Sequence, residues 1–106
     1  MKLPFDALIS EEKVKDYLLA QRKRNDKSKW LANAGYNQNN WQKLELDLRN
    51  QILSLDASPS DITKFGQMFE IKGMLKGPNG KSLKVNTIWM IEHETKITKF
   101  ITMFPY

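Results

Sequence analysis

The sequence has no cysteine and only one histidine, which removes two kinds of site from consideration. Without cysteine the chain cannot form a disulfide or a thiolate metal site. A zinc site built on His93 would need carboxylates for all its other protein ligands, so we expect no metal and no other cofactor. No apolar run is long enough to cross a bilayer, and the N-terminal residues lack the apolar stretch of a signal peptide. We therefore expect a cytoplasmic protein with no membrane partner.

Anions are fewer than cations in this chain. It has 106 residues, with 17 lysines and arginines against 12 acidic side chains, and a net charge of +5. This length predicts a single domain over residues 1–106 with one modest core. The basic excess favours an acidic partner, which could be RNA, DNA, an anionic membrane or an acidic protein.

The basicity is concentrated in residues 22–36, which we call the basic segment. It contains five cations within eight residues, namely Arg22, Lys23, Arg24, Lys27 and Lys29. Trp30 and Tyr36 follow them. Clustered cations beside aromatic side chains are typical of a nucleic-acid-binding surface. The alternative is a solvated, charged loop between two helices.

The first half of the chain has helical patterns. Ser10 is a candidate cap for a helix that ends near Gln21, and Asp26 for a second helix over 27–34 that ends at Gly35. A third helix is expected over 41–55, capped by Asn39 or Asn40, with pairs Lys43–Asp47 and Glu45–Arg49 on its exposed side. Residues 56–61 (DASPSD) have turn chemistry and should end it.

The second half alternates with a period of two. Strands are expected from Phe65 to Lys76, over 83–91 and over 96–104, joined by turns at 77–80 and 93–95. Three sequential strands with short turns predict an antiparallel meander. The fold class is therefore α+β, with N-terminal helices packed on a C-terminal antiparallel β-meander.

Familiar catalytic motifs are missing. The stretch GPNGKS lacks the spacing and the following helix of a phosphate-binding loop, so a hairpin tip is the better interpretation. Glu92, His93 and Glu94 could supply a general acid or base, although a polar turn is the commoner meaning of such a cluster. Thr87 and Thr102 lie in predicted strands, where a β-branched residue is usually structural.

A site without a strong acid–base pair can still cleave RNA. The 2′-hydroxyl of RNA is an internal nucleophile, so the protein need only orient the backbone and neutralise charge on the phosphate. DNA lacks this nucleophile, and DNA cleavage is accordingly less favoured by the residues present.

An ordered series of short motifs runs along almost the whole chain. It comprises KLP at 2–4, KVKDYLL at 13–19, DKSKWLANAGY at 26–36, FGQMFEIKGMLKGPNGK at 65–81, VNTIWMI at 85–91 and ITMF at 101–104. This series resembles an uncharacterised bacterial domain family, whose members are short free-standing proteins or the C-terminal toxin tips of large polymorphic toxins. The residues that match the family pattern are Lys13, Tyr17, Leu19, Lys27, Lys29, Gly35, Phe65, Gly66, Gly77, Gly80, Thr87, Trp89 and Thr102. The chain departs from the family pattern at two places. Asp26 stands where glycine is usual, and Trp30-Leu31 replaces the usual aliphatic residue followed by phenylalanine.

The resemblance implies a toxin-like domain, and its layout is similar to that of the barnase/EndoU/colicin/RelE superfamily of ribonucleases. It implies a metal-independent ribonuclease with RNA as substrate and an antitoxin or immunity protein as partner. We expect Lys27 and Lys29 to bind the phosphate and stabilise the transition state, and Thr87 and Thr102 to place the phosphate or the 2′-hydroxyl. Arg22, Lys23 and Arg24 would add contacts to the nucleic acid. The alternative is a non-catalytic module that holds an acidic partner, either an antitoxin or a nucleic acid, through the basic segment.

Overall fold

Four antiparallel strands form one sheet in the order β1-β2-β3-β4, and short helices precede them in the chain. The structure is a computed structural model that describes residues 1–24 and 26–106. The helical segments are η1 (Glu12–Leu18), α1 (Ser28–Ala32), η2 (Gln38–Asn40), α2 (Trp41–Asp47) and η3 (Leu48–Ile52). The strands are β1 (Ser58–Ile62), β2 (Gly66–Lys76), β3 (Ser82–Glu92) and β4 (Thr98–Pro105). The α+β class is as predicted.

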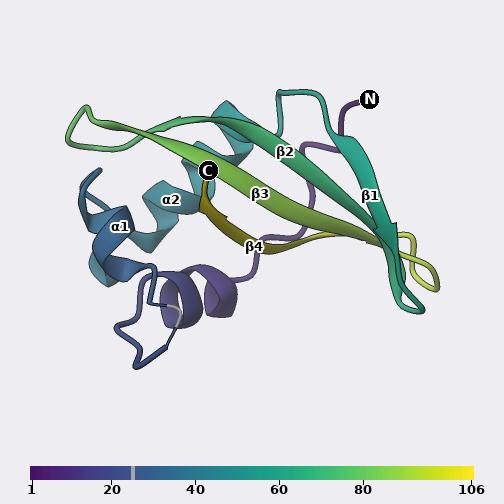
Figure 1. The fold of residues 1–106 in the computed structure, drawn as a ribbon, viewed down its shortest axis with the longest axis horizontal. Helices are drawn as coiled ribbons and strands as arrows, with labels where there is room; N and C mark the ends of the chain where they lie inside the picture. The colour runs from purple at the N-terminus through teal and green to yellow at the C-terminus, as the bar shows by residue number, and fades with distance from the viewer. Residues whose placement is uncertain (25) are drawn as a thin grey trace.

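The core lies between the helices and one face of the sheet (Figure 1). Alternate residues of β3, such as Val85, Thr87 and Trp89, point to this face and are fully buried. The Trp89 ring meets that of Phe100 edge to face, with centroids 5.1 Å apart. From the helical side, Leu44, Leu48 and Ile52 complete the core. These three residues recur at every fourth position, which puts them on one stripe of the helical segment.

The helices occupy the middle of the chain, which corrects the prediction that they would be N-terminal. Residues before Ser10 are largely extended, and they lie along the outer edge of β4. The backbone N–H of Leu8 donates to the Thr98 carbonyl at 2.8 Å, and the N–H of Phe100 donates to the Leu8 carbonyl at 2.8 Å. The N-terminal segment therefore satisfies part of an edge that would otherwise be unpaired.

Residues 56–61 were expected to be a turn, but residues 58–62 form β1, so the sheet has four strands and not three. The strand pairs with β2, with Ser58 opposite Glu70 and Pro59 opposite Phe69. All of its residues are exposed. Proline is tolerated on an edge strand, because one row of backbone groups there needs no partner. Turn-like composition and an edge strand are therefore compatible.

The predicted third helix also differs in detail. It consists of α2 followed by the wider turns of η3, where the Leu53 N–H donates to the Leu48 carbonyl at 3.0 Å. Asn40 is the N-cap residue of α2, as one of the two predicted caps, but its side chain makes no cap hydrogen bond to that helix. The side-chain cap lies one short turn earlier, where Asn37 and Asn40 form a capping box around η2. The pair Lys43–Asp47 exists at 2.9 Å, but Asp47 is only 3% exposed and was wrongly placed on the surface. Its other oxygen accepts a hydrogen bond from the Tyr36 hydroxyl at 2.6 Å, which explains how the carboxylate can be buried.

The hairpin between β2 and β3 confirms the turn predicted at 77–80, and its tip contacts the end of α1 (Figure 1). The Asn79 side chain donates to the Asn33 carbonyl at 3.0 Å, and the Asn79 N–H donates to the Ala34 carbonyl at 3.3 Å. A Cβ on Gly77 would lie 2.0 Å from the Ala34 carbonyl oxygen, so glycine is required for this close approach. The tip thereby holds the short helix that follows Lys27.

Candidate functional site

Three side chains from distant parts of the sequence meet beside strand β4. The Lys27 ammonium donates to the Thr102 hydroxyl at 2.9 Å and lies 3.5 Å from the Tyr17 hydroxyl. Tyr17 comes from η1, Thr102 from the middle of β4, and Lys27 from the residue before α1. Helix η1 packs against β4, which brings the tyrosine to the sheet. We call Tyr17, Lys27 and Thr102 the hydroxyl–lysine cluster.

A β-bulge directs Thr102 towards this cluster. Thr102 pairs with Ile88 and Phe100 pairs with Trp89, so Ile101 is an extra residue on β4. Phe100 and Met103 are both buried in the core, and Thr102 therefore points to the opposite face of the sheet. If Ile101 took a regular place in the strand, alternation from the buried Phe100 would turn Thr102 inwards. Bulges frequently re-aim a side chain in this way next to functional sites.

Three cations surround the Tyr17 ring. Arg22 lies 4.8 Å, Lys27 5.3 Å and Lys13 5.6 Å from its centroid. Among residues 1–24 and 26–106, none of these cations forms an ion pair with a carboxylate. Their charges are thus available to an anion that approaches the tyrosine.

The electrostatics of the cluster act on the tyrosine itself. The pKa of the Tyr17 hydroxyl is below its ordinary value, first because the Thr102 side chain hydrogen-bonds to it. Burial opposes this shift, and the positive charges of Lys27 and Arg22 add to it. A tyrosine with these neighbours becomes a phenolate more readily, and a phenolate can accept a proton.

Local sequence fixes the position of Lys27. The Asp26 carboxylate accepts a hydrogen bond from the Ser28 N–H at 2.8 Å, although the N-cap residue of α1 is Lys27 and not Asp26 as predicted. The hydrogen bond from the Ser28 hydroxyl is the main reason that the pKa of Asp26 is lowered. The Leu31 N–H donates to the Lys27 carbonyl at 3.0 Å, so the backbone of Lys27 belongs to the first turn of the helix. Asn25, in the same segment, lies outside the described residues.

A pocket of about 340 Å³ opens beside the cluster. It is lined by Ser10, Glu12, Lys13, Asp16, Tyr17 and Arg22. The two acidic residues would repel a phosphate, whereas Lys13 and Arg22 would attract it. Charge in this pocket is therefore mixed, and the most favourable place for an anion is the end where Tyr17 and the cations converge.

One family model matches residues 5–106 of this chain, and its description is "Domain of unknown function (DUF6883)". The chain belongs to this family. The match spans η1, the basic segment and all four strands, so it includes every residue of the hydroxyl–lysine cluster. No curated protein and no solved structure matches the chain.

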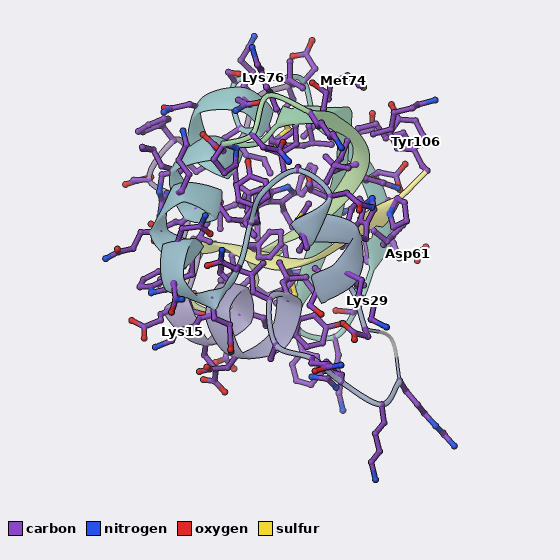
Figure 2. The ribbon with its side chains drawn as sticks, turned by 90° about the vertical axis from the view of Figure 1, so that its left-hand side faces the viewer. Lys15, Lys29, Asp61, Met74, Lys76 and Tyr106 are labelled. Atoms are coloured by element: carbon purple, nitrogen blue, oxygen red, sulfur yellow. The ribbon has the colours of Figure 1, made fainter. Side chains whose placement is uncertain are left out.

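The structure of this DUF6883 domain separates the two lysines that the sequence grouped together. Lys29 is exposed and borders a different pocket of about 480 Å³, which Tyr36 and Gln38 also line. Figure 2 shows Lys29 at the surface near the start of α1. Of the predicted nucleic-acid contacts, Arg22 joins the cluster, while Lys23 and Arg24 are exposed residues of the loop.

Thr87 is fully buried and lies on the core face of the sheet. Its hydroxyl donates to the Ile71 carbonyl at 2.9 Å and accepts from the Trp89 indole N–H at 2.7 Å. Both of its hydrogen-bonding roles are used within the core of the DUF6883 domain. The structure therefore does not bring Thr87 to Lys27 or to the surface.

Glu92 ends β3 and His93 begins the turn to β4, and their side chains hydrogen-bond to residues outside the hydroxyl–lysine cluster. The His93 Nε2 is 3.0 Å from the Thr63 carbonyl, and Glu92 accepts from Lys99 at 2.8 Å. The Lys99 hydrogen bond is the main cause of the lowered pKa of Glu92. Over the described part of the chain, no group of three or more His, Asp or Glu side chains could hold a metal ion, and no helix could cross a membrane.

Sequence reasoning overlooked Tyr17 as a functional residue of this DUF6883 domain. The tyrosine looked like part of the apolar face of its helix, beside Val14 and Leu18. Two signals could have identified it. Lys13 precedes it by four residues, which places the ammonium over the ring in a helix, and Tyr17 itself matches the family pattern.

Proposed function

We propose that this domain is a metal-independent ribonuclease whose reacting phosphate binds at the hydroxyl–lysine cluster. The observation that supports this most directly is the Lys27 ammonium, which contacts two hydroxyl groups and, among residues 1–24 and 26–106, pairs with no carboxylate. A lysine with this environment can exchange its contact with Thr102 for one with a phosphate oxygen. A lysine in a stabilising ion pair would lose its partner in the same exchange.

In the proposed reaction, Tyr17 as a phenolate removes the proton of the RNA 2′-hydroxyl. The 2′-oxygen attacks phosphorus, the bond from phosphorus to the 5′-oxygen breaks, and that oxygen takes a proton from water. The hydroxide that remains takes the proton from Tyr17, which restores the phenolate. The products are a 2′,3′-cyclic phosphate and a free 5′-hydroxyl. Lys27 and Arg22 stabilise the negative charge that develops on the phosphate, and Thr102 keeps the tyrosine and the lysine in position.

We further propose that such an activity serves as a bacterial toxin held in check by an antitoxin or immunity protein. Growth arrest on expression in bacteria, relieved by a neighbouring gene, would support this role. The exposed cations Lys23 and Arg24 favour the alternative of a non-catalytic module that holds RNA or an acidic protein. Cleavage separates the two functions, since a binding module leaves RNA intact.

Purified protein is expected to cut RNA in the presence of EDTA and to leave the same sequence intact when the nucleotide at the cleavage site is 2′-deoxy. Mass spectrometry should find a 2′,3′-cyclic phosphate on the 5′ fragment. The Lys27→Ala variant serves as a control for a contaminating nuclease. Cleavage that requires Mg²⁺, or that proceeds equally on DNA, would contradict the mechanism.

The cleavage rate is expected to rise with pH along a limb whose apparent pKa lies below 10.0, the ordinary value for tyrosine. The folded protein lowers the pKa of Tyr17, so the phenolate that acts as base is present at lower pH than in an unfolded chain. Thr102→Val should move this limb to higher pH, because the Thr102 hydrogen bond is the largest cause of the shift. Tyr17→Phe should abolish the limb. An unchanged pH profile in Tyr17→Phe would exclude the tyrosine as base.

A further inference from the structure

The face of the sheet opposite the core contains exposed lysines, exposed apolar and aromatic side chains, and one buried amide. Alternation along the strands puts Lys72, Met74, Lys84, Asn86 and Phe104 on this face, and Thr102 lies on it too. Met74 is 53% and Tyr106 is 51% exposed, so this half of the face is open to solvent. Figure 2 shows Tyr106 on the same side of the molecule as Lys29.

Tyr106 is held over this face by two lysines. The Lys84 ammonium lies 4.9 Å and the Lys72 ammonium 5.6 Å from its ring centroid. Lys72 also lies 3.8 Å from Glu70, whereas Lys84 takes part in no ion pair among the described residues. An aromatic ring between cations is the combination that binds single-stranded nucleic acid, because the ring stacks on a base and the cations meet the phosphates.

Asn86 supplies an independent observation. It is more than nine-tenths buried, and its Oδ1 atom has no hydrogen-bond partner within the described residues. Its cross-strand neighbours are Lys72 and Phe104, both with exposed side chains. A buried amide oxygen without a donor is unfavourable, and such groups often mark a place where a ligand supplies the missing partner.

We infer that this face binds the RNA strand beside the cleaved phosphate, with a base stacked on Tyr106 and hydrogen-bonded to Asn86. The inference rests on the proposed function for its choice of RNA. It follows from continuity, because Thr102 of the cluster and Asn86 lie on the same face of adjacent strands, and from charge, because Lys72 and Lys84 attract a polyanion. The Oδ1 atom accepts a hydrogen bond, which each standard base can supply from an exocyclic amino group or, in uracil, from N3–H. Such a base would reach Oδ1 by displacing the exposed side chains that cover it.

Binding can be tested without cleavage by using 2′-O-methyl RNA oligomers, titrated by fluorescence anisotropy. Tyr106→Ala should weaken binding about five- to a hundred-fold, the range for loss of one base stacked on an aromatic side chain. Phe65→Ala is the matched control, because Phe65 is an exposed aromatic with Lys64 5.1 Å from its centroid, and this change should leave affinity the same. Equal affinities of the two variants would overturn the inference.

Asn86→Leu separates recognition from structure. The parent protein should bind oligo(A) more tightly than the matching oligomer of purine riboside, in which hydrogen replaces the exocyclic amino group, and the variant should lose this preference. Its melting temperature should not fall, because an apolar side chain of similar size removes an unsatisfied polar group. A retained preference would overturn the role of Asn86. If the parent protein binds these oligomers as described but cuts no RNA, the proposed ribonuclease function fails and the binding face stands.

Discussion

Replacing Lys27 with alanine is expected to lower the single-turnover rate of RNA cleavage about ten- to a thousand-fold, as when one donor to a transition-state charge is lost. Lys27 is the residue that joins the Tyr17 hydroxyl to the Thr102 hydroxyl. Its loss removes the charge nearest to the proposed phosphate position. The measurement needs saturating protein, so that weaker binding does not mimic a slower chemical step.

Two neighbouring lysines provide matched controls. Lys23→Ala removes the same charge from an exposed position in the same loop, and Lys29→Ala removes it from the other side of α1. Both should lower RNA affinity slightly and leave the single-turnover rate within about threefold, a difference below ~1 kcal/mol. Circular dichroism should show the same fold in all three. If Lys27→Ala cleaves as fast as Lys23→Ala, the site lies elsewhere, and His93 with Glu92 becomes the next candidate.

The Thr87→Val variant is expected to lose about 2–4 kcal/mol of folding free energy. Valine has nearly the shape of threonine, but it leaves the Trp89 indole N–H and the Ile71 carbonyl without this buried partner, at about 1–3 kcal/mol for an unsatisfied group. Urea denaturation monitored by tryptophan fluorescence measures the change, provided that unfolding is two-state.

Thr87→Ser is the informative comparison, because it keeps the hydroxyl and deletes only a methyl group. It should be destabilised by less than the valine variant, at about 1 kcal/mol. The folded fraction of Thr87→Val should cleave RNA at nearly the parent rate, since Thr87 is remote from solvent. A stable but inactive Thr87→Val variant would instead assign this threonine to the chemistry.

Much of the fold could be predicted from the sequence because its signals are local. The two-residue alternation of β2 and β3, the glycines at 77–80 and the spacing of core residues along α2 and η3 each depend on residues close together in the chain. The Asp26 side chain does hydrogen-bond to the start of α1, but Lys27 is the N-cap residue. Strand β1 could not be identified, because its Ser, Pro and Asp residues become a strand only through pairing with β2.

The site was predicted only in part, for a related reason. The basic segment is evident from charge, but Lys27 and Thr102 are 75 positions apart, and only the packing of η1 on β4 brings Tyr17 to both. Sequence favoured Lys27 and Lys29 equally. The start of α1 separates the two side chains, because residues two positions apart on a helix lie about 200° apart around its axis.

The extra residue in β4 has a consequence for any attempt to transplant this constellation onto another scaffold. The bulge absorbs Ile101, so a single short strand gives Phe100 and Met103 to the interior and Thr102 to the exterior although Phe100 and Met103 are an odd number of positions apart. A regular strand of the same sequence with Phe100 buried would instead point the Thr102 hydroxyl to the interior. The bulge at Ile101 is thus as much a part of the constellation as its side chains are.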